Sequence, residues 1–385
     1  MNPHESIVAL IKNMYKNLNP IMLHAPVFSG NEKKYLSECI DTTYVSYVGE
    51  FVNRFEQMTA SFTGAKSAVA TVNGTTALQI ALQVAGVQNG DEVITQSLTF
   101  VATANAIFHC GAIPVFIDVD LDTMGMSPDK LSDFLKNNTI MKNGQCYNKH
   151  SDRNINAIIP MHTFGHPCRI DEIVEIANMY HIPVIEDAAE SLGSTYKNKH
   201  TGTFGLAGII SYNGNKTITT GGGGMIITNN TEIAEKARHL TTTAKVKHPW
   251  EFIHDQVGYN YRMPNVNAAI GVAQMENIDS YLSNKKETAH LYENFFKETS
   301  IQFCKSPEHS ESNYWLNAIL FKNSKERNGF LRHSNSQGVI TRPVWKLMNH
   351  LRMYQDCQTG ALDNSQIIES RLVNIPSGFR KTDTE

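Results

Sequence analysis

The chain has 385 residues, of which 41% are hydrophobic and 18% charged, a composition that fits a globular protein with one large domain and one smaller one. A formal net charge of −3 gives no electrostatic basis for binding nucleic acid or an anionic membrane surface. The six cysteines lie far apart and no apolar run reaches about 18 residues. We therefore expect a reduced, cytoplasmic protein without a disulfide framework, a structural metal site or a membrane span.

Apolar runs alternate with helix-like stretches between about residues 65 and 240, after a short amphipathic helix expected within residues 1–18. We expect strands at 67–72, 91–96, 112–119, 155–162, 182–187, 206–213 and 224–228. We expect helices at 77–86, 99–111, 126–138, 169–181 and 231–240. This alternation predicts an α/β fold with a mostly parallel sheet that helices cover on both faces.

The pattern changes beyond about residue 245, where helical stretches within 265–298 are followed by isolated strands expected at 313–321 and 338–341. The sequence therefore predicts two domains. The large domain would span residues 1–245, with the N-terminal helix included, and a smaller α+β domain would span residues 246–385.

Polar residues that follow the expected strands are the candidates for chemistry, because ligands of open α/β sheets bind beyond the carboxyl ends of the strands. In "VNGTTAL", Gly74 and Thr75 lie where a strand turns into a helix, so that free backbone N–H groups and a hydroxyl would face a bound anion. The alternative is an ordinary helix cap made by Thr75. The spacings of a Walker A loop and of GxGxxG are both absent.

Two further strand ends carry candidate residues. Asp187 ends the very apolar run "IPVIED", where a buried carboxylate needs a cation or strong donors; capping of the next turn is the alternative. Ser211 ends the next strand, and Lys216 follows in "SYNGNKTITTGGGGMIIT". A desolvated lysine can serve as a Schiff-base amine, although an isolated lysine is more often a surface charge. The four glycines need not hold phosphate, because they can shape the backbone entering the next strand.

The order of these elements suits pyridoxal 5'-phosphate, which needs a phosphate site, a partner for the pyridine nitrogen and a lysine amine. The stretches "NGTTALQIAL", "TFVATANAI", "EDAAESLGS", "SYNGNKTITTGGGGMIIT" and "GYNYRMPNVNAAIG" together resemble the DegT/DnrJ/EryC1/StrS family of sugar-nucleotide aminotransferases, over about residues 24–376. Within that family the chain is most similar to the LegC-like and PglE-like branch. The resemblance implies a fold-type-I homodimer that depends on pyridoxal phosphate, with a large domain and a smaller C-terminal one.

The resemblance assigns roles to single positions. Lys216 would form the Schiff base with the cofactor and then move the proton, and Asp187 would pair with the pyridinium nitrogen. The remaining cofactor contacts that it implies are Gly74, Thr75, Phe100 (stacked on the ring), Glu190, Ser211 and Asn260, the last reaching the phosphate of the neighbouring subunit.

Glu190 departs from the histidine or glutamine that many relatives carry near the phenolic oxygen of the cofactor, where a carboxylate would repel unless it held a proton. His162 and His166 in "MHTFGHP" have metal-ligand spacing on a helix, but Gly165 and Pro167 argue against a helix and no third ligand is evident. We therefore expect no metal, and His162 only as a wall of the cofactor pocket.

The reaction implied by the resemblance moves an amino group from L-glutamate to the 4-keto position of a UDP-linked 4-keto-6-deoxy-N-acetylhexosamine, for the synthesis of an amino sugar, a nonulosonic acid or a surface glycan. Candidate sugar-nucleotide contacts are Ser46, Tyr47, Val48, Arg262, Arg342 and Trp345. The alternatives are a 3-keto sugar aminotransferase, a non-catalytic sugar-nucleotide-binding protein and a phosphate-loop module. A branch of the family that dehydrates sugars carries histidine in place of the lysine, and Lys216 argues against it.

Overall fold

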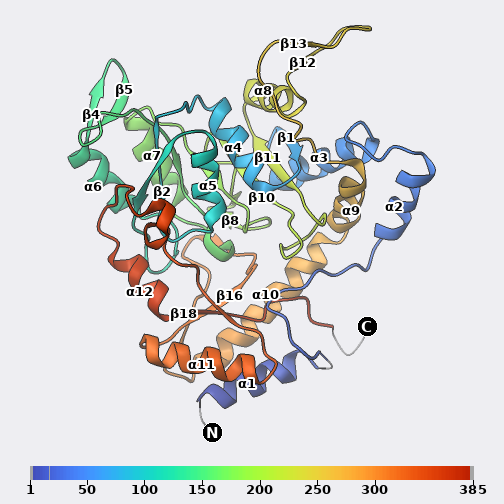
Figure 1. Cartoon of the computed structure of the whole chain (residues 1–385). Helices are drawn as coiled ribbons and strands as arrows, with labels where there is room; N and C mark the ends of the chain where they lie inside the picture. The colour runs from blue at the N-terminus through green and yellow to red at the C-terminus, as the bar shows by residue number, and fades with distance from the viewer. Residues whose placement is uncertain (1–2, 17, 382–385) are drawn as a thin grey trace.

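The computed structural model describes residues 3–16 and 18–381 and shows a large lobe built around one twisted sheet, with a smaller lobe beside it (Figure 1). The strand order β3-β2-β6 continues into β7-β10-β11-β1, because the backbone of Ile158 donates to Pro183 and that of Asp187 donates to Pro160. Neighbouring strands are parallel except at β11, which is antiparallel to both β10 and β1. The predicted mostly parallel α/β sheet is thus confirmed. Its strands are β1 (Ser67–Thr71), β2 (Glu92–Gln96), β3 (Ile113–Ile117), β6 (Ile155–Ile159), β7 (Ile185–Asp187), β10 (Ala207–Ser211) and β11 (Gly224–Thr228).

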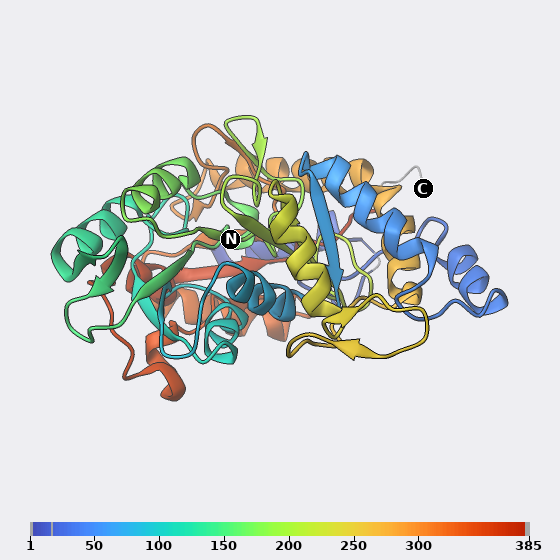
Figure 2. The same cartoon turned by 90° about the horizontal axis from the view of Figure 1, so that it is seen from above.

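Helices cover both faces of this sheet, because successive residues of each strand point to opposite sides. Ile209 and Ile226 join the apolar core beneath α4, α5 and α8, whereas Ile210 and Ile227 join the core beneath α3 and α9. Figure 2 shows β1 lying between α3 and α8. The covering helices are α3 (Glu50–Thr63), α4 (Gly74–Val84), α5 (Val101–His109), α6 (Pro128–Asn138), α7 (Ile170–Met179), α8 (Thr231–Thr241) and α9 (Asn265–Met275).

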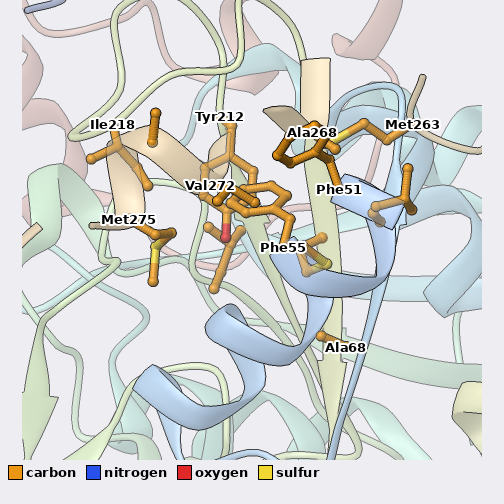
Figure 3. Packing of buried hydrophobic residues seen from close by; sticks show 14 of the residues in the cluster. Phe51, Phe55, Ala68, Tyr212, Ile218, Met263, Ala268, Val272 and Met275 are labelled. Carbon is orange, nitrogen blue, oxygen red and sulfur yellow. The ribbon is translucent and has the colours of Figure 1, made fainter. Parts of the chain in front are cut away.

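The core beneath α3 and α9 fixes the segment that joins β10 to β11 (Figure 3). Phe55 of α3 packs on Tyr212 with ring centroids 4.7 Å apart, and a Cβ added at Gly271 of α9 would lie 2.7 Å from the Phe55 ring. Tyr212, the first residue of the segment, and Ile218, near its middle, are both fully buried. The residues between them are therefore held at both sides by close packing.

The smaller lobe contains the antiparallel sheet β14-β16-β18-β17, flanked by α10, α11 and α12. The N-terminal helix α1 (Pro3–Met14), which confirms the predicted amphipathic helix, packs into this lobe beside α11 (Figure 1). In contrast, α9 packs against α2 (Glu32–Asp41) and α3. The predicted division after residue 245 stays a prediction. The elements of the smaller lobe are α10 (Ile278–Phe296), β14 (Gln302–Phe303), β16 (Asn317–Leu320), α11 (Ser324–Ser336), β17 (Arg342–Pro343), α12 (Asp363–Arg371) and β18 (Leu372–Ile375).

Short elements complete the fold, among them the hairpin of β12 and β13, which projects from the large lobe (Figure 1). The expected strand at 338–341 forms only an isolated bridge between Val339 and Ile21, because its backbone meets an irregular segment instead of a strand. None of the helices that the structure describes is long and apolar enough to cross a membrane. The short elements are β4 (Thr139–Lys142), β5 (Gln145–Asn148), β8 (Thr195–Tyr196), β9 (Lys199–His200), β12 (Lys245–Val246), β13 (Ile253–His254), β15 (Ser310–Glu311) and the 3-10 turns η1 (Thr163–Gly165), η2 (Met348–His350) and η3 (Arg352–Tyr354).

Candidate active site

Lys216 lies on the segment between β10 and β11, at the carboxyl end of the parallel strands. Its Nζ is 3.2 Å from Oε1 of Glu190 and 3.9 Å from the centre of the Trp315 ring. Only 12% of its side chain is exposed. This lysine is therefore held inside the protein by a carboxylate and an aromatic face, and is not a solvated surface charge.

Glu186 and Asp187 are adjacent on β7 and point in opposite directions, so that only one of them faces the lysine. The Glu186 carboxylate accepts hydrogen bonds from the backbone N–H groups of Gly202, Phe204 and Gly205 at 2.7–2.8 Å, and lies 3.0 Å from Nε2 of His162. These bonds satisfy a buried charge within the scaffold. Glu186 is therefore structural, and Asp187 is the carboxylate available for chemistry.

Asp187 is buried and is bound by two donors. The hydroxyl of Thr103, on α5, donates to Oδ2 at 2.6 Å, and the backbone N–H of Ala189 donates to Oδ1 at 3.2 Å. Burial raises the pKa of this carboxyl, while the Thr103 hydroxyl, the Ala189 N–H and the Lys216 ammonium act to lower it. The surroundings thus support an ionised carboxylate once a further cation is placed beside it.

Glu190 is buried and holds the lysine. Besides its contact with Lys216, it accepts a hydrogen bond from the backbone N–H of Phe164 at 2.9 Å. Burial raises its pKa to about 7; Lys216 and the Phe164 N–H oppose this rise, and Asp187 adds to it. Glu190 is therefore a carboxyl group that can take up or release a proton near neutral pH.

The start of α4, Ser211 and the last glycine of the run meet at one corner of the site. Asn73, and not Thr75, caps α4: its side chain accepts the N–H of Thr76 at 2.8 Å. A Cβ added at Gly74 would lie 3.2 Å from Cβ of Ser211, and one at Gly224 would overlap the backbone of Asn73. The glycines thus allow strand and helix to approach closely, so that the start of α4 lies beside the Ser211 hydroxyl, an arrangement that could face an anion.

Aromatic side chains connect Phe100 with Phe164, whose backbone N–H binds Glu190. Phe100, the residue before α5, is 48% exposed, and its ring centre lies 6.1 Å from that of Trp345. Trp345 in turn lies 5.0 Å from Phe164. Because α5 also carries Thr103, one helix places both an exposed ring and the hydrogen bond to Asp187.

The structure adds Thr103, Asn313 and Trp315 to the residues predicted from the sequence. Asn313 and Trp315 precede β16, in the stretch "SNYWLNAIL" that was expected to be a strand from residue 313. A strand pattern gave no reason to place them at the lysine. Thr103 lay within a predicted helix, where its spacing of three residues from Phe100 indicates a shared face.

Other predicted contacts lie against different parts of the protein. Ser46, Tyr47 and Val48 are exposed on the loop between α2 and α3, where the carbonyl of Ser46 accepts the N–H of Asn265. Arg262 is buried against Glu56, with a 2.7 Å ion pair, and exposed Arg342 donates to Asn335. Asn260 is exposed and its backbone pairs with Thr242.

His162 lies behind Asp187. The backbone N–H of Cys168 donates to its Nδ1 at 3.2 Å, which leaves Nε2 to donate to Glu186. Its backbone N–H also donates to the carbonyl of Asp187. His162 thus supports the strand end that carries Asp187. Over residues 3–16 and 18–381, no group of three or more His, Cys, Asp or Glu side chains is placed to hold a metal ion.

A buried lysine, two buried carboxylates and a helix N-terminus beside a hydroxyl at one edge of an α/β sheet suit a transferase that works through a lysine amine and a phosphorylated cofactor. Residues 27–385 match the DegT/DnrJ/EryC1/StrS aminotransferase family, and the chain belongs to that family. The resemblance seen in the sequence is thus confirmed.

Curated relatives and solved structures agree with this assignment. The chain is 37% identical to GDP-perosamine synthase of Escherichia coli O157:H7 over 336 residues, which cover 87% of each protein. It is 36% identical over 376 residues to EpsN of Bacillus subtilis strain 168, whose given name is that of a pyridoxal phosphate-dependent aminotransferase, with 95% and 92% of the two chains covered. A crystal structure of a DegT DnrJ EryC1 StrS aminotransferase from Brucella abortus superposes with a TM-score of 0.81 at 25% identity, over 90% of each chain. The protein is a sugar-nucleotide aminotransferase that depends on pyridoxal phosphate.

Proposed function

We propose that this protein transfers the amino group of L-glutamate to the 4-keto carbon of a UDP-linked 4-keto-6-deoxy-N-acetylhexosamine, in the synthesis of a bacterial amino sugar, nonulosonic acid or surface glycan. The observation that carries the transamination is the Lys216 amine held 3.2 Å from Glu190 at the strand edge that also carries Asp187. The identity of the sugar and its nucleotide is supported by the sequence resemblance to the LegC-like and PglE-like branch. The cytoplasmic location likewise rests on the sequence.

The residues present fit pyridoxal phosphate. Gly74, Thr75 and Ser211 would hold the phosphate, because the α4 N-terminus presents N–H groups beside a hydroxyl and a Cβ at Gly74 would make a tight 3.2 Å contact with Ser211. Asp187 would hold the ring nitrogen, and Phe100 would cover one face of the ring. When bound, the cofactor supplies an aldehyde carbon that takes the amino group and a cationic ring that withdraws electrons.

The protein's own residues then bind, orient and move protons. Asp187 stays ionised beside a cationic ring, because the Thr103 hydroxyl and the Ala189 N–H stabilise its charge. Lys216 must give up a proton before its amine can react, and Glu190, with a pKa raised to about 7, is the acceptor in contact with it. Once free, the Lys216 amine would take a proton from the donor carbon in the first half-reaction and give a proton to the sugar carbon in the second.

A second copy of the chain would complete the site. The hairpin β12–β13 and its surroundings expose large apolar side chains that a monomer would leave in water, including Trp250 (79% exposed), Phe252 (82%) and Val257 (84%). Exposed apolar patches of this kind indicate an interface. Asn260 follows the hairpin directly and is exposed, which supports its proposed reach to the cofactor phosphate of the partner.

Mixed dimers test this shared site. Lys216→Ala and Asn260→Ala subunits are each expected to be inactive alone. In an equal mixture that has exchanged subunits, half of the dimers are mixed, and one of the two sites of each mixed dimer combines an intact lysine with an intact asparagine. The mixture should therefore recover up to a quarter of the wild-type activity. A mixed dimer with no recovery would place Asn260 in the same site as its own Lys216, or outside it.

The candidate contacts to the sugar nucleotide differ in their surroundings. Trp345 lies beside Phe100, and its flat ring suits contact with a sugar ring or a base. Ser46, Tyr47 and Val48 are exposed on one loop and free to cover a ligand. Arg342 is exposed, whereas Arg262 is already bound to Glu56, so that a substrate contact from Arg262 would need this ion pair to rearrange.

The decisive experiment for the substrate is a panel of nucleotide ketosugars incubated with the enzyme, pyridoxal phosphate and L-glutamate, with each aminated product identified by mass. The proposal expects turnover of the UDP-linked 4-keto-6-deoxy-N-acetylhexosamine. GDP-linked 4-keto-6-deoxy sugars form the second arm, because three of the curated relatives are named GDP-perosamine synthase. Faster turnover of a GDP sugar, or of a 3-keto sugar, would refute the proposed substrate while leaving the aminotransferase assignment in place.

A further inference from the structure

A short segment of the smaller lobe, residues 312–315, lies against the segment that carries Lys216. Ser312 donates to the carbonyl of Gly165 at 2.9 Å, and Tyr314 adopts a left-handed backbone conformation with φ of 48°. Its four residues precede β16 and connect the smaller lobe to the lysine. We call them the Ser312–Trp315 segment.

Trp315 contacts the lysine in two ways. The face of its ring lies 3.9 Å from Nζ of Lys216, and its indole Nε1 donates to the carbonyl of Asn215 at 2.7 Å. The side chain is 4% exposed. One residue therefore contacts both the amine and the backbone just before it.

Asn313 ties the same segment to the loop of Glu190. Its Nδ2 donates to the carbonyls of Glu190 and Leu192, both at 2.9 Å, and lies 3.3 Å from the hydroxyl of Thr217. Its Oδ1 accepts the backbone N–H of Trp315 at 2.8 Å. The two partners of Lys216, the carboxylate and the ring, are thus held in register by a single amide.

Lys285 of α10 holds the segment from behind. Its buried ammonium donates to the carbonyls of Ser377 at 2.8 Å, Trp315 at 3.1 Å and Tyr314 at 3.4 Å. These acceptors match its three hydrogens, and burial lowers its pKa to about 7. The ammonium therefore anchors Trp315 through the backbone.

We propose that Trp315 is a positioning residue for Lys216, and that Asn313 and Lys285 set its place, so that the smaller lobe fixes the direction of the reacting amine. The proposal rests on the proposed function only in naming Lys216 as the reacting group. Truncating Trp315 frees the amine to take other rotamers and exposes it to solvent. The carbonyl of Asn215 also loses this donor.

The first test uses the cofactor-free protein and does not depend on activity. Acetic anhydride is added in limiting amount, and the acetylation rate of each lysine is read by peptide mass spectrometry. Trp315→Leu is expected to raise the rate at Lys216 roughly three- to tenfold, the size of effect expected from removing a cation–π contact. Trp315→Phe keeps an aromatic face but no N–H, and should fall between wild type and Trp315→Leu.

Lys285→Met with Lys286→Met as its matched control separates the anchor from a general loss of charge. Lys286 is the next residue on α10 and pairs with Glu311 at the surface. Lys285→Met is expected to raise the acetylation rate of Lys216, and Lys286→Met to leave it unchanged. Equal rates at Lys216 in wild type, Trp315→Leu and Lys285→Met would overturn the proposal. If Trp315→Leu does not fold, the Phe and Lys285→Met variants decide in the same way.

The second test uses the enzyme loaded with pyridoxal phosphate. If Trp315→Leu misplaces the Lys216 amine, the single-turnover rate of amino transfer from glutamate should fall about tenfold. The glutamate concentration for half-saturation should change little. An effect on half-saturation alone would contradict a positioning role. If wild type binds the cofactor but transfers no amino group from glutamate, the proposed function fails, whereas the acetylation test still decides the role of Trp315.

Discussion

Replacing Glu190 with glutamine removes a carboxyl group in contact with Lys216 and keeps its shape and its ability to accept the Phe164 N–H. In the folded protein the Glu190 pKa rises from 4.5 to about 7, chiefly because the group is buried. In the unfolded chain the group returns to its ordinary value. Between pH 4.5 and 7, the folded state therefore binds more protons at this position than the unfolded state does.

The sign of the effect follows from this difference. A group whose pKa is raised on folding contributes stability at low pH that is lost as the pH rises through the folded-state pKa. A shift of about 2.5 units corresponds to about 3 kcal/mol, at 1.36 kcal/mol per unit. The free energy of unfolding of wild type minus that of Glu190→Gln should thus fall by about 3 kcal/mol from pH 4.5 to 7, and level off above pH 8.

The measurement is urea unfolding of the cofactor-free protein at a fixed protein concentration, followed at several pH values between 4 and 9. A second pair, Lys216→Met with and without Glu190→Gln, gives the control. Lys216 lowers the Glu190 pKa, so that its removal should carry the fall in stability to higher pH.

A difference that stays flat over pH 4.5–7 would refute the reasoning, because it would show that the ammonium keeps Glu190 ionised throughout. A difference that grows with pH would do so more strongly, since it would mean a pKa lowered on folding. In either case Glu190 could not serve as a proton acceptor for Lys216 near neutral pH.

Three further predictions concern the neighbourhood of the site. Thr103→Val removes the 2.6 Å hydrogen bond to Asp187, and about 2 kcal/mol of support for its charge should appear as a 10- to 100-fold slower amino transfer in rapid-mixing absorbance. Gly224→Ala places a Cβ 2.7 Å from the backbone nitrogen that starts α4, and should weaken pyridoxal phosphate binding by about 1–3 kcal/mol in a fluorescence titration. Gly222→Ala, with its nearest contact at 3.9 Å, should bind like wild type; equal binding of both variants would contradict the geometry. Phe55→Ala should lower the free energy of unfolding by about 3–5 kcal/mol, and a loss below 1 kcal/mol would show that this core does not support the lysine segment.

Much of the sheet could be predicted from the sequence because its strands are short apolar runs bounded by polar turns. β10 is an example, with Ser211 as its last residue and Lys216 five residues further on. The chemistry at the strand ends followed from topology, since parallel strands place their carboxyl ends at one edge. The motifs of the family then supplied the roles.

The parts that sequence reasoning missed depend on contacts between distant residues. Asn313 reaches the carbonyl of Glu190 across 123 residues, and Trp315 reaches Asn215 across 100. Neither pair leaves a periodic pattern in the chain, and the apolar residues around Trp315 favoured a longer strand. The adjacent acids Glu186 and Asp187 could not be separated without the backbone N–H groups of residues 202–205.

That separation has a consequence for how the enzyme can be altered. Glu186 holds the fold together, whereas Asp187 is the proposed partner of the cofactor. Substitutions at these two adjacent positions should therefore have different effects. Damage at Glu186 should reduce the amount of folded protein, and damage at Asp187 the turnover of each molecule that remains. A selection for new sugar specificity should therefore leave Glu186 unchanged and direct its diversity to Phe100 and Trp345, the neighbouring aromatic residues proposed to meet the cofactor and the sugar.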